Sequence, residues 1–380
     1  MSLLSCQLDA YLTQTDAAVL DTRAHPDGVE VRLGATLLYP EGGGQPDDHG
    51  SVAGRPVRAL RKDADGVVWH LLDDAPAQET VTVTVDWGRR FDHMQQHTAQ
   101  HLISAIAADR FGALTTAFHL RPGVCDIDLS RGLSAKELRA LESAVNTAIR
   151  DNLAVRAQVS SVEALDAVRT RGLPAGFSGD VRLVEIDGLD LNTCGGTHVA
   201  SLGELQAVSL MPLQKNKGGA KLRYLAGGRL LSRLAETYAR EHTISKLLSS
   251  GLSEHAEGIR RLQQGAKDAA RSQKALLGEL ASFIGGDLAR QARPHLHREE
   301  ADMNFLRAAA TAATSAAPER TFLLTGGGMF MVAGPEAAVK ALGPQVAALL
   351  GGRGGGARGR FQGRVGSLDQ IEAAVAMISA

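Results

Sequence analysis

Hydrophobic and polar residues alternate in short segments near the start of the chain. Residues 29–33 and 81–85 each place valine or leucine at every second position. Between them, residues 57–72 predict a β-hairpin that turns at Asp65-Gly66. Short strands joined by close turns are typical of a small barrel. We therefore expect an N-terminal small β-barrel over residues 1–90.

The pattern then changes to that of helices. Residues 93–110 have helical propensity and end before Gly112, a suitable residue to follow a helix C-terminus. A second helix is predicted after Ser134, which can form a capping box with Glu137. Its apolar stripe consists of Leu138, Leu141, Val145, Ala148 and Ile149. Strand-like sequence follows at residues 181–186 and around 222–228. We expect a central α+β domain over residues 91–229.

The last third of the chain predicts two further parts. Residues 230–285 are rich in leucine and alanine and are interrupted by Gly251 and Gly258, which favours a helical linker made of two helices. Residues 286–380 predict a small α/β domain. Its expected pieces are a strand hairpin over 321–334, a helix over 336–350 and a glycine- and arginine-rich loop over 351–364.

Composition narrows the class of protein. The 380 residues carry a net charge of −1, so no global field attracts nucleic acid or an anionic membrane, and such binding must come from local patches. No apolar run reaches the roughly 18–20 residues that span a bilayer, and we expect no membrane segment and no signal peptide. Cys6, Cys125 and Cys194 form an odd, scattered set, which argues against a disulfide framework and favours a reducing cytoplasm.

Two distant segments each place two metal-ligating residues four positions apart. In HTAQH, His97 and His101 share one face of a predicted helix. In CGGTH, Cys194 and His198 flank two glycines that let the backbone turn tightly and direct both side chains inward. Either pair alone could be a chance surface or core pair. Together, three histidines and one cysteine favour a Zn²⁺ site.

A zinc peptidase is the obvious enzyme to consider for this spacing. Its helical motif needs a glutamate directly after the first histidine to act as general base. Here that position holds Thr98, and position 100 holds Gln100. The general base is missing, so we do not expect a peptidase.

The ordered motifs resemble a known family. HTAQH followed far downstream by CGGTHV, with the upstream segment LYPEGGGQPDDHG at residues 38–50, is similar to the editing domains of alanyl-tRNA synthetases and to freestanding alanyl-tRNA editing proteins. The resemblance covers roughly residues 20–230. No aminoacylation module precedes it, so we expect the editing part without the synthetase. The glycine-rich C-terminal region resembles the DHH-associated domain of the long form of this family.

The resemblance implies an aminoacyl-tRNA hydrolase, a carboxylic ester hydrolase that deacylates alanine tRNA mischarged with serine or glycine. A pocket shaped for alanine excludes glycine and serine poorly, so a second site must remove the errors. We assign Gln45 and Thr98 to catalysis, as polar groups that satisfy the serine hydroxyl, and Gly43 and Gly44 to close backbone approach to substrate. The alternatives are a solvated turn amide for Gln45 and an ordinary helix residue for Thr98.

Two aspects of the predicted zinc site stay open. Asp190 could hold a ligating imidazole through its free N–H, or could cap a turn. With three ligands, one zinc per chain would leave a position for a water that attacks the ester, whereas four ligands would close the site and leave zinc to organise the pocket.

Basic residues provide candidate tRNA contacts. One run lies downstream of the second metal motif and consists of Lys215, Lys217, Lys221, Arg223 and Arg229. A second lies in the glycine-rich segment and consists of Arg353, Arg358, Arg360 and Arg364, with Phe361 available for stacking. We expect Lys217, Arg223, Arg353 and Arg360 to bind substrate. Alternatively, the first run is a solvated face, and the second is a tight turn of a packed domain. The C-terminal domain either contacts the tRNA or mediates homodimer formation.

Two other functions compete with editing. A zinc-stabilised tRNA- or RNA-binding protein without hydrolase activity would also use four ligands and basic patches. A phosphoesterase acting through the C-terminal domain is disfavoured, because the Asp-His-His motif of those enzymes is absent from the sequence.

Overall fold

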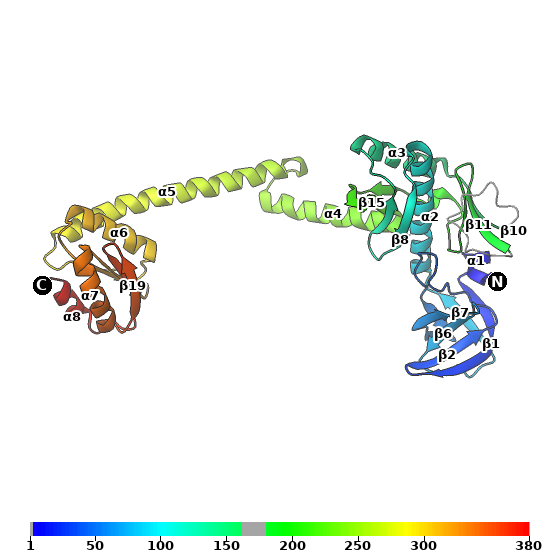
Figure 1. Ribbon diagram of the computed structural model, residues 1–380, viewed down its shortest axis with the longest axis horizontal. Coiled ribbons are helices and arrows are strands. Elements are labelled where there is room, and N and C mark those ends of the chain that lie inside the picture. Colours follow the sequence, from blue (N-terminus) through cyan, green and yellow to red (C-terminus); the bar gives the residue numbers. More distant parts are fainter. Residues whose placement is uncertain (1–2, 162–179, 380) are drawn as a thin grey trace. The chain divides into compact units, whose positions relative to one another are not determined.

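The computed structural model describes residues 3–161 and 180–379 (Figure 1). The chain forms two compact units, Met1–Glu241 and His242–Ala380, which are described separately below. Both contain helices and strands, so the predicted mixed α+β class is confirmed. Among the described residues, no helix has the length and apolar character needed to cross a membrane.

The first unit begins with a short helix and a curled, seven-stranded antiparallel sheet. These elements are α1 (Ser5–Leu8), β1 (Gln14–His25), β2 (Gly28–Leu33), β3 (Gly50–Val52), β4 (Arg55–Pro56), β5 (Ala59–Lys62), β6 (Val68–Leu72) and β7 (Thr80–Val85). The sheet order is β4-β3-β7-β1-β2-β6-β5, an open order rather than the closed ring of a barrel. Pairing of β5 with β6 confirms the hairpin predicted over residues 57–72. A core of apolar residues that includes Val31, Leu38 and Val83 packs with this sheet.

A long central helix, α2 (Trp87–Phe111), follows the curled sheet. Asp86 caps its N-terminus by accepting from Arg89 N–H, and Gly112 ends it with a left-handed φ of 60°. The helix therefore starts six residues before the predicted 93, and its predicted end is confirmed. The side chains of α2 from His93 to Ile103 are all buried, so this helix forms the centre of the unit.

Two sheets and a second helix surround α2. The helix α3 (Ala135–Asp151) begins with the predicted capping box of Ser134 and Glu137. One sheet joins β10 (Val155–Ser161), β11 (Asp180–Ile186) and β12 (Asp190–Thr193). The other joins β13 (Val208–Leu210), β15 (Gly219–Ala226), β9 (Cys125–Leu129) and β8 (Thr115–His119), with β14 (Gln214–Asn216) paired to β15. A short 3₁₀ turn, η2 (Leu202–Leu205), links the two sheets. Figure 1 shows β8 and β15 beside α2, in agreement with their contacts.

The predicted helical linker is two helices, α4 (Gly227–Leu248) and α5 (His255–Arg290), separated by a bend and a 3₁₀ turn, η3 (Leu252–Glu254). The break at Gly251 is confirmed. The predicted interruption at Gly258 is wrong, because this residue lies inside α5 and is buried. A Cβ added there would lie 3.3 Å from the Leu248 side chain, so the missing side chain serves close packing rather than a helix break.

The second unit contains a five-stranded sheet with the order β16-β17-β18-β20-β19. Its elements are β16 (His295–His297), α6 (Met303–Ala316), β17 (Phe322–Gly326), β18 (Met329–Ala333), α7 (Glu336–Leu349), β19 (Arg353–Ala357), β20 (Arg360–Arg364) and α8 (Ile371–Ser379). The predicted strand hairpin over 321–334 and the helix over 336–350 are confirmed. The predicted loop over 351–364 is wrong: it is the β19–β20 hairpin, in which a Cβ at Gly356 would meet the Arg360 carbonyl at 1.9 Å.

Candidate metal centre

The two predicted ligand pairs meet in the first unit. His97 and His101 lie one turn apart on α2, and Cys194 and His198 lie in the loop that follows β12. The ligand atoms of these four residues all lie within 4.8 Å of one another. The three histidines are buried, and Cys194 is half-buried. This cluster could hold one metal ion.

The imidazoles face the cysteine through one nitrogen each. The Sγ of Cys194 lies 3.4 Å from His97 Nε2 and 3.3 Å from His198 Nε2. Burial opposes ionisation of the Cys194 thiol, but the nearby His97, His198 and His101 rings outweigh it and hold the pKa of this thiol well below its usual range. The thiolate is the form that binds metals, so the surroundings of Cys194 favour the ligating state.

The opposite nitrogen of each histidine has its own hydrogen-bond partner. His97 Nδ1 lies 2.9 Å from Gln45 Oε1, His198 Nδ1 lies 3.0 Å from Thr98 Oγ1, and His101 Nδ1 lies 3.3 Å from Asp190 Oδ2. An acceptor at Nδ1 fixes the proton there and leaves Nε2 free to ligate. Gln45, Thr98 and Asp190 thus orient the three imidazoles toward one point.

Gln45 is held in place by a tight turn. Gly42 and Gln45 exchange two backbone hydrogen bonds of 3.1 and 3.0 Å, and the two residues between them, Gly43 and Gly44, have φ angles of 57° and 81°. Glycine adopts this left-handed backbone without steric cost, which explains the GGGQ sequence. The Gln45 amide also bonds to Thr197, accepting from its N–H at 3.0 Å and donating to its Oγ1 at 2.9 Å.

Thr98 lies on α2 directly after His97 and is fully buried. Besides its contact with His198, its Oγ1 accepts a 3.3 Å hydrogen bond from Val199 N–H. The hydroxyl therefore ties α2 to the backbone of the CGGTH loop. Both residues assigned to catalysis from the sequence thus adjoin the ligand histidines, on the side away from Cys194.

Asp190 opens β12 and is buried beside His101. Burial opposes protonation of the His101 ring, but Cys194 and Asp190 outweigh it and raise the pKa of His101 to about 9. Of the two roles left open for Asp190, the structure places it against a ligand imidazole.

The shape of the CGGTH loop depends on two residues. Gly196 lies against His97 so closely that an added Cβ would be 2.3 Å from the ring's Cε1. Arg182 on β11 is buried and donates through Nη1 to the carbonyls of Cys194 and Gly196, both at 2.8 Å. These contacts hold the loop against α2. The available signal for Arg182 in the sequence was a charged residue within an apolar strand segment.

Comparison with known proteins identifies the family. Residues 181–225 match the family described as "Threonyl and Alanyl tRNA synthetase second additional domain". The alanyl-tRNA editing protein Aarsd1 of Danio rerio is 36% identical over 96% of this chain and 94% of its own length. This chain belongs to the alanyl-tRNA editing protein family. Aarsd1 of Rattus norvegicus is 38% identical over 94% of this chain and 93% of its own length. The alanyl-tRNA editing protein AlaX-L of Pyrococcus horikoshii is 30% identical over 60% of this chain and 59% of its own length.

The basic residues predicted to meet tRNA differ in their surroundings. Lys215 and Lys217, on and after β14, are exposed. Lys221 is engaged with Asp126 and Asp128 at 2.5 and 2.8 Å, and Arg229 forms a two-point ion pair with Asp92. Arg223 is half-buried on β15. In the second unit, Arg353 and Arg360 are exposed on the β19–β20 hairpin, while Phe361 packs in the core there.

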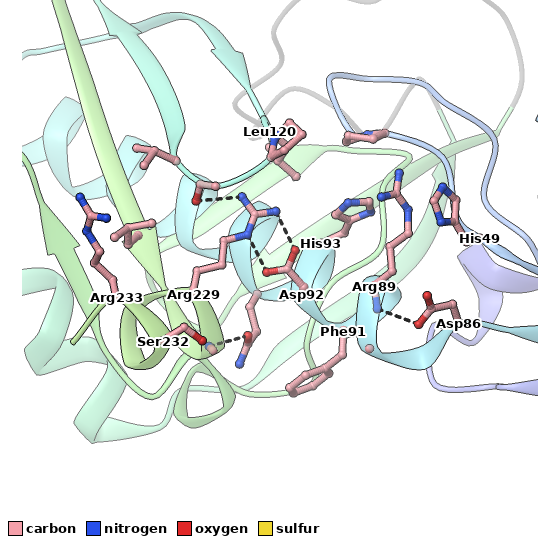
Figure 2. Close-up of a pocket in the computed structure, with 18 of the residues that line it drawn as sticks. His49, Asp86, Arg89, Phe91, Asp92, His93, Leu120, Arg229, Ser232 and Arg233 are labelled. Atoms are coloured by element: carbon pink, nitrogen blue, oxygen red, sulfur yellow. Dashed lines mark hydrogen bonds and ion pairs between the residues drawn. The ribbon is translucent and has the colours of Figure 1, made fainter. Parts of the chain in front are cut away.

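Two cavities lie close to the metal cluster. The smaller, of about 600 Å³, is lined by Cys194 and Gly195 together with residues of α1 and the curled sheet, including Arg32 and Lys62. The larger, of about 980 Å³, is lined by the first turns of α2, including His93 (Figure 2). Sequence reasoning missed His93, although its position four residues before His97 was the available signal.

Proposed function

We propose that this protein is a trans-editing hydrolase that deacylates alanine tRNA mischarged with serine or glycine. Similarity along nearly the whole length of proteins named for alanyl-tRNA editing supports this function. The observation that carries it is the buried cluster of three oriented histidines and a thiolate-favouring cysteine. We assign the editing domain to residues 91–229, and the three free cysteines fit a reducing cytoplasm.

The donor set fits one zinc ion per chain. Zinc favours cysteine sulfur and histidine nitrogen in a tetrahedron, in which sulfur and nitrogen ligands lie about 3.5 Å apart. The observed 3.3 and 3.4 Å separations between Cys194 Sγ and two Nε2 atoms are close to this value. All four side chains converge, which favours a closed site. When bound, zinc would supply a fixed positive charge beside the scissile ester.

We propose that Gln45 and Thr98 serve this reaction by fixing the ligand imidazoles. Each makes at least two hydrogen bonds within the site, to a ligand histidine and to the CGGTH loop. Thr98 Oγ1 accepts from Val199 N–H, and with the His198 proton on Nδ1 it accepts from that ring as well. Gly43 and Gly44 are exposed beside Gln45, so a ribose hydroxyl or an amino-acid ammonium group can approach their backbone carbonyls.

We propose that tRNA contacts come from both units. Lys217 and Arg223 lie on the hairpin formed by β14 and β15, and Arg353 and Arg360 are exposed on the β19–β20 hairpin. Phosphate contacts from these residues would weaken with rising salt. The C-terminal region is also our candidate for homodimer formation.

The proposed function is tested by ester hydrolysis on three substrates. Alanine tRNA is charged separately with serine, glycine or alanine, and loss of the amino acid is followed with catalytic amounts of protein. We expect hydrolysis of the serine ester at least about tenfold faster than that of the alanine ester, because a site that hydrogen-bonds the serine hydroxyl leaves polar groups unpaired with alanine. Binding of the tRNA without hydrolysis of any ester would instead indicate a zinc-stabilised RNA-binding protein.

A further inference from the structure

The larger cavity has a built interior with no role in the site described so far. Its walls come from five segments of the first unit: the first turns of α2, the residues that follow Gln45, the β8–β9 turn, the end of β15 and the start of α4. Figure 2 shows the side chains of His93, Arg89 and Arg229 gathered around it. The volume of about 980 Å³ is at the upper end of the range of small-molecule sites.

One ring nitrogen of the buried His93 has no hydrogen-bond partner in the part of the chain that the structure describes. The residue is 4% exposed, lines the cavity, and its Nδ1 has no hydrogen-bond partner among the described residues. Burial, and next the charge of Arg89, lower the pKa of His93 to about 4, so the ring is neutral at physiological pH. A neutral imidazole can donate or accept one hydrogen bond at each nitrogen. The ring lines the cavity, and its Nδ1 is left without a partner, so a small rotation of the side chain would let it bond to a ligand there.

The charges around the cavity are nearly balanced. The lining contains three arginines and three carboxylates, namely Arg89, Arg229, Arg233, Asp86, Asp92 and Glu236. Arg229 and Asp92 pair at 2.6 and 2.7 Å, and Arg89 bonds to Asp47 at 3.3 Å. Half of the Arg233 side chain is exposed, and it forms a 3.5 Å ion pair with the exposed Glu236. Equal numbers of arginines and carboxylates disfavour a highly charged ligand such as a polyphosphate.

The remaining lining is apolar. Phe91, Leu120, Val124 and Leu225 contribute surface against which a flat ring can pack. One nucleotide of a single strand combines such a flat ring with hydrogen-bonding edges and a single phosphate charge. The cavity therefore offers an apolar surface for a base, the His93 imidazole for its edge, and Arg233 for its phosphate.

The cavity also lies next to the metal cluster. His93 precedes His97 by four residues, which is about 6 Å along the helix. Pro46 in the cavity wall directly follows Gln45, and Leu120 N–H donates to the Gly44 carbonyl at 3.4 Å. We propose that this cavity binds a nucleotide of the single-stranded 3′ end of tRNA, adjacent to the aminoacylated terminal adenosine. This inference rests on the editing function proposed above.

Binding of an uncharged RNA tests the site without requiring hydrolysis. The probes are two fluorescein-labelled acceptor-stem minihelices, one ending in CCA and one lacking these three nucleotides. Affinities of the full-length protein are measured by anisotropy. Ser232→Trp fills the cavity from an exposed position, Arg233→Glu reverses the rim charge, and His93→Leu removes the imidazole. Ala235→Trp and Arg240→Glu are matched controls on α4 that lie outside the cavity lining.

We expect each of the three cavity variants to bind the CCA-ended minihelix about tenfold more weakly than wild type. The two control variants should stay within about twofold of wild type. With the shortened minihelix, the cavity variants should show no such loss. Equal affinities for cavity and control variants would overturn the proposal, as would equal losses with both minihelices. The outcome is separable from the proposed function. Selective losses in a protein that hydrolyses no ester would support the cavity and refute editing, whereas active protein with unchanged binding would do the reverse.

Discussion

At the scale of single residues, the metal cluster is defined as much by its anchors as by its ligands. Gln45, Thr98 and Asp190 come from a glycine turn, from α2 and from β12, and each holds the Nδ1 of a different histidine. The ligands must converge within a few tenths of an ångström for a metal to bind. Removing an anchor should therefore act on metal affinity first and on ester hydrolysis through it.

Thr98 offers the cleanest test of this role. Thr98→Val keeps the shape of the side chain and removes the hydroxyl that bonds His198 Nδ1 and Val199 N–H. We expect zinc affinity, measured by chelator competition, to fall roughly 10- to 100-fold, and the free energy of unfolding of the metal-free protein to fall by about 1–3 kcal/mol. Thr98→Ser, which keeps the hydroxyl, should retain most of the zinc affinity. Equal zinc affinity in both variants would contradict the anchoring role.

Two neighbouring glycines provide a matched pair in the CGGTH loop. A Cβ at Gly196 would lie 2.3 Å from the His97 ring, whereas one at Gly195 would meet only the end of the Gln7 side chain, at 3.3 Å. We expect Gly196→Ala to displace His97, losing most bound zinc and about 1–3 kcal/mol of unfolding free energy. Gly195→Ala should bind a full equivalent of zinc by elemental analysis. A Gly196→Ala protein with a full equivalent of zinc would show that zinc binding does not need the close approach of Gly196 to the His97 ring.

The ligands could be predicted from the sequence, but the anchors' contacts could not. His97 and His101 share a helix face, and Cys194 and His198 flank two glycines, so local geometry brings each pair together. Gln45 lies 52 residues from His97 in sequence, and Thr98 lies 100 residues from His198. Such partners depend on how the curled sheet and the CGGTH loop pack against α2, which no local pattern encodes. His93 was missed because His97, four residues further on, was already paired with His101.

At the scale of elements, sequence patterns predicted helix ends best where a side chain bonds to backbone a few residues away. The capping box of α3 is an example: Ser134 Oγ accepts from Glu137 N–H at 3.2 Å, and Glu137 Oε2 accepts from Ser134 N–H at 2.7 Å. Both residues are close in sequence, so the pattern alone predicts the structure. The start of α2 at Trp87 is also set locally, by the Asp86 side chain that accepts from Arg89 N–H, and this signal was missed. The β19–β20 hairpin depends on strand pairing, which propensity does not report.

The capping box also predicts a pH dependence. The ion pair with Arg131, followed by the bonds to Ser134, lowers the pKa of Glu137 from 4.5 to about 2. A lowered pKa in the folded state means that Glu137 stabilises the protein above pH 4.5 and that this contribution is lost as the pH falls from 4.5 toward 2. Glu137→Gln should therefore be less stable than wild type in urea unfolding at pH 6, with a smaller difference at pH 3, both in chelator. A difference that does not change with pH would contradict this account.

At the scale of the whole molecule, the two compact units carry different parts of the proposed function. The metal cluster, both cavities and the glycine turn belong to the first unit, while the second contributes exposed arginines on the β19–β20 hairpin. Composition could predict that several domains exist, because the chain changes from alternating strands to helices and then to glycine-rich sequence. Composition could not show that residues 1–90 and 91–229 belong to one compact unit, because their association depends on contacts across α2.

The most direct test of the account is whether ester hydrolysis depends on the metal cluster. Serine-charged alanine tRNA is incubated with wild type, with wild type stripped by a chelator, with the stripped protein after zinc is restored, and with Cys194→Ala, while zinc content and folding by circular dichroism are measured in parallel. We expect hydrolysis to disappear with the zinc, to return with it, and to be absent in folded Cys194→Ala. Undiminished hydrolysis by zinc-free, folded protein would contradict the central claim that this cluster is the active site.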